Sequence, residues 1–342
     1  MLLKRLLALA ALAVPAAAWT STASADTTIR LGVSKIANVA PVAVAIGKGY
    51  FKSEGLDPKL TFFESQAPVA VAVASGDLDF GDAAETAALY NLAQGGRARI
   101  LTSGANEAPT FHSLAIVASN QAYAAGLKTP KDLPGHSFAL TQMGTGLQYN
   151  LGQIAQKLGF DINTIKLMPL QSNPNIASAL SGGRADAAVF DSTNALPLID
   201  KGEVKLIGWT GDITGITPAY LVFASRDMVD NHGDTVKRFM AAMRKADEDY
   251  YDAFTDAQRL RKDGPTAKET LAMIAKFLDQ TPEQVALGLP YIDREGRVDM
   301  AAVQSQIDWY RGIGAIKGEI KVDTVVDTRY ALTAPSTQAS AH

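Results

Sequence analysis

The chain has 342 residues, of which 47% are hydrophobic and 20% charged, and its formal net charge is −3. This balance is typical of a globular protein with an ample core and argues against disorder. The sequence contains no cysteine, which excludes disulfides, thiolate metal sites, a cysteine nucleophile and a lipid-bearing N-terminal cysteine. Near-neutral charge without a long Lys/Arg run argues against a nucleic-acid partner.

The first 25 residues have the three-part layout of a secretory signal peptide. Lys4 and Arg5 precede an apolar run at 6–14, and Ala23-Ser24-Ala25 fits the small-residue cleavage rule, with a second such point at 16–18. This run is too short for a bilayer-spanning helix, which needs about 20 residues; an N-terminal membrane anchor is the alternative. We expect a soluble protein exported to the bacterial periplasm, not a lipoprotein.

Short apolar runs alternate with helical patterns along the first third of the chain. Strands are expected at 29–33, 60–63, 78–81 and 99–102, and helices at 67–75, at 84–94 and from Pro41 to the glycines at 47–49. This order predicts an α/β fold with a mainly parallel sheet covered by helices on both faces.

The same pattern restarts after residue 129. Strands are expected at 136–140, 165–170, 185–190 and 204–209, with helices at 147–158, 176–180 and 195–200. One more strand at 219–224 precedes a helical remainder. Its helices are expected near 234, at the capping-box patterns Thr266/Glu269 and Thr281/Gln284, and around Ile307.

An internal repeat links the two units. Residues 69–80 align with residues 176–187, so that Gly76 matches Gly183 and Asp79 matches Asp186. Each copy predicts a small-residue helix, a glycine turn, an aspartate and an apolar strand. Chance similarity between Ala-rich segments is the alternative, but the matching order and context favour two related lobes.

No catalytic or metal-binding motif is present. The four histidines have no partner at metal-ligand spacing, and the sequence has no H-E-x-x-H, G-x-S-x-G or P-loop pattern. Gly144 and Gly146 follow a strand, but Tyr149 stands where a dinucleotide fingerprint would need its third glycine. We therefore nominate no catalytic residue, no metal ligand and no cofactor.

The segment at 141–149 is the most informative one. It leaves a strand, passes Gly144 and Gly146 and enters a helix, so its free backbone N–H groups and the helix dipole would favour an anion. The alternative is an ordinary glycine turn with Thr145 as the helix cap.

Polar residues cluster after the other expected strands as well, where open α/β sheets bind ligands. Singly, each is better explained as a loop or cap residue; together they predict a cleft between two lobes. The candidate ligand-binding residues are Ser34, Asn38, Gln66, Glu85, Glu107, Thr141, Gly144, Thr145, Gly146, Tyr149, Gln171, Asp191, Ser192 and Trp209.

Several segments resemble a known family. Residues 47–56, with Gly49-Tyr50-Phe51 and Gly55-Leu56, resemble the A-x-x-x-G-[FY]-F-x-x-x-G-L stretch of periplasmic solute-binding proteins that serve nitrate, sulfonate, taurine and thiamine-precursor ABC importers. Residues 75–81 resemble the x-G-x-x-D-F-G element of that family, 131–135 its D-L-K-G-K element, and 144–149 its G-S-x-x-H-Y helix start, with Gln148 in place of the histidine. The resemblance covers roughly 29–225.

The resemblance implies a type II periplasmic-binding fold, in which two α/β lobes with two crossovers close on one small ligand. The implied lobes are 26–118 joined with 220–334, and 119–219, with a flexible tail at 335–342; we expect the crossovers to bend near 115–122 and 215–222. The yeast pyrimidine synthases of this family carry a cysteine-rich iron motif that this chain lacks, so their activity is not implied.

We therefore expect a non-enzymatic, monomeric substrate-binding component of an ABC transporter. It would capture a sulfonate, carboxylate, nitrate-like anion or zwitterion in the periplasm and deliver it to an inner-membrane permease. The acidic side chains of Glu85, Glu107 and Asp191 would repel a purely anionic ligand and could contact an amino group instead. The alternatives are a secreted α/β enzyme with Asp191 or Glu107 as acid/base, and a ligand-sensing module of a membrane receptor.

Overall fold

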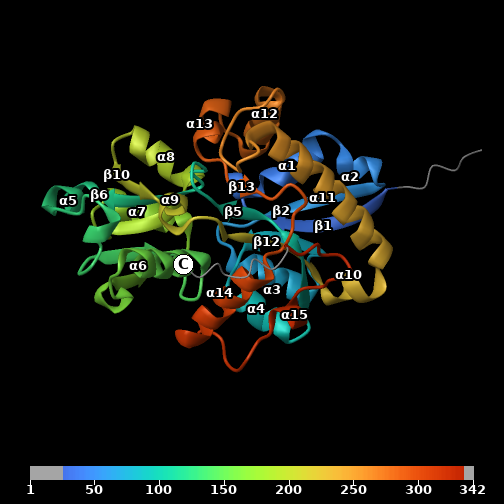
Figure 1. Cartoon of the computed structure of the whole chain (residues 1–342), viewed down its shortest axis with the longest axis horizontal. Helices are drawn as coiled ribbons and strands as arrows, with labels where there is room; N and C mark the ends of the chain where they lie inside the picture. The colour runs from blue at the N-terminus through green and yellow to red at the C-terminus, as the bar shows by residue number, and fades with distance from the viewer. Residues whose placement is uncertain (1–25, 335–342) are drawn as a thin grey trace, which may run out of the picture.

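The computed structural model describes residues 26–334, so the expected signal peptide at 1–25 and the tail at 335–342 lie outside the described residues. Figure 1 shows two α/β lobes side by side. The N-terminal and C-terminal parts of the chain share one lobe, and the middle of the chain forms the other. Within 26–334, no helix is long and apolar enough to cross a membrane.

The first lobe is built on a five-stranded sheet with the order β2-β1-β3-β12-β4. Its strands are β1 (Thr27–Val33), β2 (Leu56–Phe62), β3 (Phe80–Ala84), β4 (Ala98–Ser103) and β12 (Tyr220–Ser225). The short helix η1 (Ala37–Val39) and the helices α1 (Ala40–Gly47), α2 (Tyr50–Ser53), α3 (Ala67–Ser75) and α4 (Ala87–Gln94) connect them. β12 is buried along its whole length, which explains its unbroken apolar run.

The C-terminal helices cover this sheet. They are α10 (Arg226–Asn231), α11 (Gly233–Phe254), α12 (Ala267–Leu278), α13 (Pro282–Leu287), α14 (Met300–Gly312) and α15 (Val322–Val325). The expected apolar stripe of α11 is buried against the sheet, where Phe239 stacks on Phe80 with 3.9 Å between ring centroids. The C-terminal part of the chain therefore completes the core of the N-terminal part.

The second lobe has the sheet order β10-β6-β9-β7-β8. Its strands are β6 (Leu114–Ser119), β7 (Ser137–Leu140), β8 (Lys166–Pro169), β9 (Ala187–Asp191) and β10 (Val204–Trp209). Its helices are α5 (Asn120–Ala125), η2 (Pro130–Asp132), α6 (Gly146–Leu158), η3 (Ile162–Thr164), α7 (Asn173–Ser181), α8 (Ser192–Asp200) and α9 (Thr210–Thr214).

As predicted, the sheets are mainly parallel: in each of them four of the five strands run in the same direction, and one strand runs against its neighbours. β12 pairs antiparallel with β3 and β4, and β6 pairs antiparallel with β9 and β10. The chain enters each of these two strands from the other lobe. Each strand therefore begins beside the C-terminal ends of the strands that flank it. The crossover connections therefore impose the antiparallel direction.

The internal repeat corresponds to a structural repeat. The two sheet orders match strand for strand, with β6 standing for β12 and β10 for β4. Asp79 Oδ2 accepts the backbone N–H of Arg30 at 2.7 Å, and its counterpart Asp186 Oδ2 accepts that of Ser137 at 2.8 Å. Both bonds span the same sequence separation of 49 residues. In each lobe, the repeated aspartate ties the strand that follows the small-residue helix to its parallel neighbour, β1 or β7.

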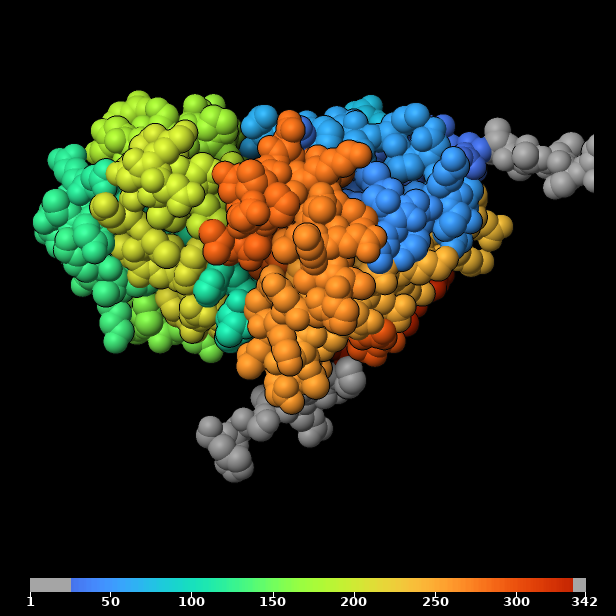
Figure 2. Space-filling model, turned by 90° about the horizontal axis from the view of Figure 1, so that it is seen from above, coloured from blue at the N-terminus to red at the C-terminus, as the bar shows by residue number. Residues whose placement is uncertain are grey.

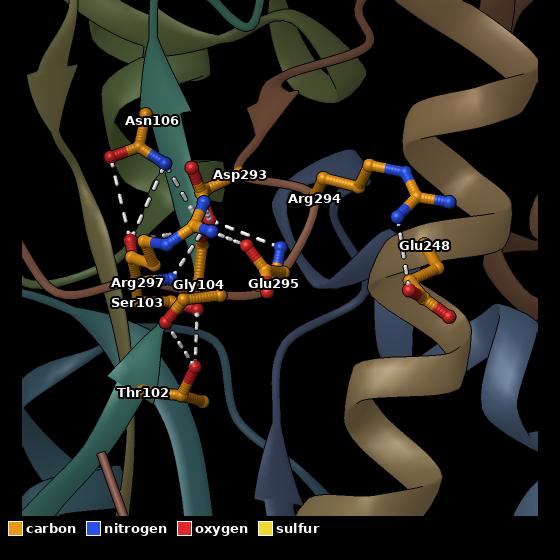
Figure 3. Close-up of polar contacts among 10 residues, drawn as sticks. Thr102, Ser103, Gly104, Asn106, Glu248, Asp293, Arg294, Glu295 and Arg297 are labelled. Atoms are coloured by element: carbon orange, nitrogen blue, oxygen red, sulfur yellow. Dashed lines mark hydrogen bonds and ion pairs between the residues drawn. The ribbon is translucent and has the colours of Figure 1, made fainter. Parts of the chain in front are cut away.

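A third, three-stranded sheet joins the lobes, with the order β11-β5-β13. β5 (Ala105–Glu107) leaves the first lobe, β11 (Thr217–Pro218) returns to it, and β13 (Tyr291–Ile292) pairs with β5 from the C-terminal region. Figure 3 shows the loop after β13 lying beside the end of β4 and the start of β5. Thr102 Oγ1, near the end of β4, donates to the Gly296 carbonyl at 2.6 Å. The connection is thus held by a third chain segment.

The first connection lies earlier than the sequence analysis placed it. The expected crossover at 115–122 runs through β6 and α5, which belong to the second lobe, because β6 pairs with β9 and β10. The expected lobe boundary after residue 118 likewise falls inside β6. Residues 104–113 join the two sheets instead.

Candidate functional site: a cleft between the lobes

A small cavity lies between the lobes, at the ends of their strands. It is lined from the first lobe by Ser65, Gln66, Ala84, Ala219 and Tyr220, and from the second by Leu114, Thr141, Thr145, Gly146, Leu147, Asn150, Asn173 and Asp191. Its volume is about 30 Å³, far below the roughly 300–1,000 Å³ of pockets that enclose drug-sized ligands. We therefore expect the lobes to separate when a ligand of several heavy atoms enters.

The start of α6 presents unpaired backbone donors to this cavity. Thr145 stands at the N-cap, but its Oγ1 donates to the Gln142 carbonyl at 2.9 Å and caps no helix N–H group. Among residues 26–334, the N–H groups of Thr145, Gly146 and Leu147 donate no hydrogen bond. The alternative interpretation, in which Thr145 caps the helix, does not hold, and the geometry suits an acceptor or anion.

Gln148 fixes the loop before this helix. Its Oε1 accepts the N–H of Gly144 at 2.7 Å, and Gly144 has a φ of 72°, in the left-handed region that favours glycine. The Gly144 N–H group is therefore satisfied within the loop and is not offered to the cavity.

Asp191 is the one charged side chain among the residues that line the cavity. It ends β9, is 5% exposed, and accepts hydrogen bonds from Tyr220 Oη at 3.3 Å and from Asn38 Nδ2 at 3.4 Å, both on the first lobe. Burial raises the pKa of Asp191 to about 6, and the Tyr220 hydrogen bond opposes this rise. A buried carboxylate with long, neutral partners is suited to an N–H donor or a cation.

Three further acidic side chains are buried near the cleft. Burial raises the pKa of Asp82, Glu85 and Glu107 to about 8 each. Ser113 Oγ donates to Glu107, whereas neither carboxylate oxygen of Asp82 has a partner among the described residues. At neutral pH these three carboxyl groups are therefore mostly protonated and uncharged.

The structure brings part of the expected ligand-binding set together. Gln66, Thr141, Thr145, Gly146 and Asp191 line the cavity. Ser34 and Asn38 lie directly behind it, because Ser34 Oγ accepts from Gln66 Nε2 at 3.2 Å and Asn38 contacts Asp191.

The other expected residues do not line the cavity. Glu85 is buried beside Tyr90 and Gln306, and Glu107 and Ser192 lie at the connection between the lobes. Gly144 packs against Ala87, Tyr149 against Trp309, and Trp209 stacks on His112 at 4.4 Å; Gln171 is exposed. These residues support the fold around the site.

The expected set omitted several lining residues. Asn150 follows Gly146 by one helical turn and donates from Nδ2 to the Gly146 carbonyl at 2.9 Å, so helical spacing from the glycine could have identified it. Tyr220 and Asn173 begin β12 and α7, and only the fold places these starts at the cleft.

The lobes touch on both sides of the cavity. On one rim, Thr193 of α8 accepts the Ala37 N–H at its Oγ1 (2.9 Å) and Gln280 Nε2 at its carbonyl (3.3 Å). On the other rim, Ala87 N donates to the Gly144 carbonyl at 2.9 Å. In Figure 2, the orange surface of α12 and α13 meets the yellow-green surface of the second lobe. The structure thus represents a closed cleft.

A sequence profile of the family described as "NMT1/THI5 like" matches residues 36–254, which is more than half of the chain. The chain belongs to the NMT1/THI5 like family. No curated protein sequence matches this NMT1/THI5 like chain.

Solved structures show the fold. The alkanesulfonate-binding protein SsuA from Xanthomonas axonopodis pv. citri, bound to MOPS, superposes with a TM-score of 0.71 at 18% identity, over 89% of this chain and 99% of its own. The periplasmic nitrate-binding protein NrtA from Synechocystis PCC 6803 gives 0.66 at 14% identity, over 87% and 84%. The desulfurization enzyme DSZB gives 0.58 at 13% identity, over 89% and 97%. The chain has the periplasmic-binding-protein fold, which binding proteins and an enzyme share.

Proposed function

We propose that this protein is the substrate-binding component of an ABC importer for a small polar molecule that carries both an acceptor or anionic group and an amino group. The acceptor end lies at the start of α6, and the amino end faces Asp191. The ligand classes that fit are amino-sulfonates, amino-carboxylates and amino-substituted heterocycles. Periplasmic location, a monomeric state and delivery to a membrane permease complete the proposal.

One observation carries the ligand class: the cavity is lined by unpaired backbone N–H groups at one point and by a carboxylate as its one charged side chain. A bare anion such as nitrate would meet the donors but would also lie near Asp191, and repulsion between like charges in a desolvated site costs several kcal/mol, roughly. An added amino group removes this repulsion and gives Asp191 a donor.

A thermal-shift panel of matched pairs tests the ligand class. It compares 2-aminoethanesulfonate with ethanesulfonate, β-alanine with propionate, and aminopyrimidine with pyrimidine, and includes nitrate. We expect the amino-bearing member of at least one pair to raise the melting temperature and its partner to have little effect. At a concentration of 100 times Kd, binding stabilises the folded state by about 2.7 kcal/mol.

The outcomes separate the proposals. Shifts with the bare anions alone would overturn the assignment of Asp191, and no shift with any compound would overturn the ligand class as a whole. Chemical conversion of a stabilising compound would favour an enzyme, a function that the fold of DSZB shows to be compatible with this architecture. Loss of uptake of that compound in cells lacking the gene, measured at low concentration, tests the transport role.

A further inference from the structure

A second contact between the lobes lies away from the cavity, where α6 of the second lobe meets α14 of the first. Tyr149 of α6 is buried in the first lobe's core, where it packs edge-on against Trp309 with 5.4 Å between ring centroids and an interplanar angle of 80°. Tyr310 lies 6.0 Å from Tyr149 and donates from its hydroxyl to the Glu85 carbonyl at 3.0 Å. None of these aromatic residues lines the cavity.

Gly152, one turn further along α6, makes the closest approach. A Cβ atom at this position would lie 2.5 Å from Cζ2, 2.7 Å from Cε2 and 2.8 Å from Nε1 of Trp309. Gly152 lies within a helix and has no positive φ, so its backbone does not require glycine. A glycine inside a helix is roughly 1 kcal/mol less favourable than alanine. The close approach of the indole accounts for glycine here.

We infer that Trp309 and Gly152 form a latch that stabilises the closed cleft. The indole lies on the bare backbone of α6 only when the two lobes are together, because α6 packs in the second lobe and α14 in the first. Trp309 is thus a positioning residue that sets the balance between open and closed forms without touching the ligand. This role rests on the proposed function only in that ligand capture requires closure.

Gly152→Ala tests the latch. The added methyl group collides with an indole that is held between Tyr149 and Tyr310, so it disfavours the closed form and leaves the open form unaffected. Trp309→Phe removes the ring atoms that collide, so the double variant should regain closure. Gly312→Ala is the matched control, because no atom lies within 4 Å of a Cβ at that glycine.

The readout does not depend on the ligand. The chain has no cysteine, so spin labels attach only at engineered Lys157→Cys on α6 and Ser305→Cys on α14, both exposed. We expect ligand-free protein to show a short-distance population that Gly152→Ala depletes, that the double variant restores, and that Gly312→Ala leaves unchanged. With a stabilising compound from the panel, Gly152→Ala should weaken Kd about tenfold if it lowers the competent population tenfold.

The two proposals fail separately. An unchanged distance distribution in Gly152→Ala would overturn the latch, as would a depleted one that Trp309→Phe does not restore. The short distances could be depleted by Gly152→Ala and restored by Trp309→Phe while the unsubstituted protein binds no panel compound. That result would support the latch and overturn the ligand class.

Discussion

Asp191, the residue proposed to bind the amino end of the ligand, depends on contacts with the other lobe. Its partners Tyr220 and Asn38 belong to the other lobe, so its environment is complete only in the closed form. Because burial raises its pKa to about 6, the carboxylate is ionised at neutral pH and becomes protonated in mildly acidic solution. A bound amino group would favour the ionised form and lower this pKa.

Affinity for an amino-bearing ligand should therefore fall in acid. Below the pKa of Asp191, we expect Kd to rise about tenfold for each pH unit, because one proton must leave before the amino group is paired. Asp191→Asn should bind the same compound weakly at pH 7.5 and show a flat pH profile. Calorimetric titrations between pH 5 and 8 measure the Kd of the unsubstituted protein and of the variant. If Kd of Asp191→Asn still rises in acid, Asp191 is not the group that pairs with the amino end of the ligand.

The buried carboxyl group of Asp82 predicts a pH-dependent stability of the protein without ligand. Its pKa in the folded state is raised to about 8 from 3.8, so the folded state holds a proton that the unfolded state releases. The stabilisation is complete below the unfolded pKa and is lost as pH rises toward 8. Glu85 and Glu107 act in the same direction.

We therefore expect the melting temperature to fall between pH 5 and 8, and Asp82→Asn to make this slope shallower. Thermal unfolding at several pH values measures the slope. Asp186, whose pKa the hydrogen bonds of Ser137 and the nearby His136 hold low against burial, offers a control: Asp186→Asn should leave the slope between pH 5 and 8 intact. An equal slope in Asp82→Asn would contradict the argument.

At the scale of elements, local signals predicted most helices and every strand of the two five-stranded sheets except β6. The stripe of α11 and the capping box of Thr281 and Gln284 are confirmed, whereas Thr266 makes no capping hydrogen bond. β6 was missed, although it lies inside the second sheet. Its run Leu114–Ser119 follows the connection, whose turn at 109–110 lies several residues upstream, and its buried place depends on partners far along the chain.

Part of the ligand-binding site could likewise be predicted from the sequence. Strand ends and helix starts pointed to Thr141, Gly146 and Asp191, which line the cavity. Tyr149 was misplaced because periodicity gives the face of a helix but not the neighbour that this face meets. Only the packing of α14 reveals that Tyr149 faces the first lobe's core.

The start of α6 yields a direct test of the anion end. Gly146 has an ordinary φ, and a Cβ there would lie 3.4 Å from the Glu85 carbonyl oxygen, an ordinary contact. Gly146→Asp should therefore fold, and a carboxylate at the first helical position favours the helix. We expect it to weaken binding of a stabilising panel compound by about 3 kcal/mol, more than a hundredfold in Kd.

Gly312→Asp is the control for this substitution, since it adds the same charge where no atom lies within 4 Å. Calorimetry gives Kd, and circular dichroism verifies folding. Unchanged affinity in a folded Gly146→Asp protein would place the acceptor end of the ligand elsewhere.

For the whole molecule, the tight cavity implies movement. Because the cavity measures only about 30 Å³, we expect the lobes to rotate about the β11-β5-β13 sheet when a ligand enters. We expect small-angle scattering to show a smaller radius of gyration when a stabilising compound saturates the protein. An unchanged radius at saturation would contradict closure of the cleft on its ligand.

The position of β12 has a consequence for how the chain acquires its structure during synthesis. β12 lies between β3 and β4, so these two strands have no ladder between them until residue 225 has been made. The second sheet uses only residues 114–209, an uninterrupted stretch that is complete earlier. The lobe that begins first is therefore the one whose sheet is completed last, and until then its unpaired strand edges are exposed to aggregation.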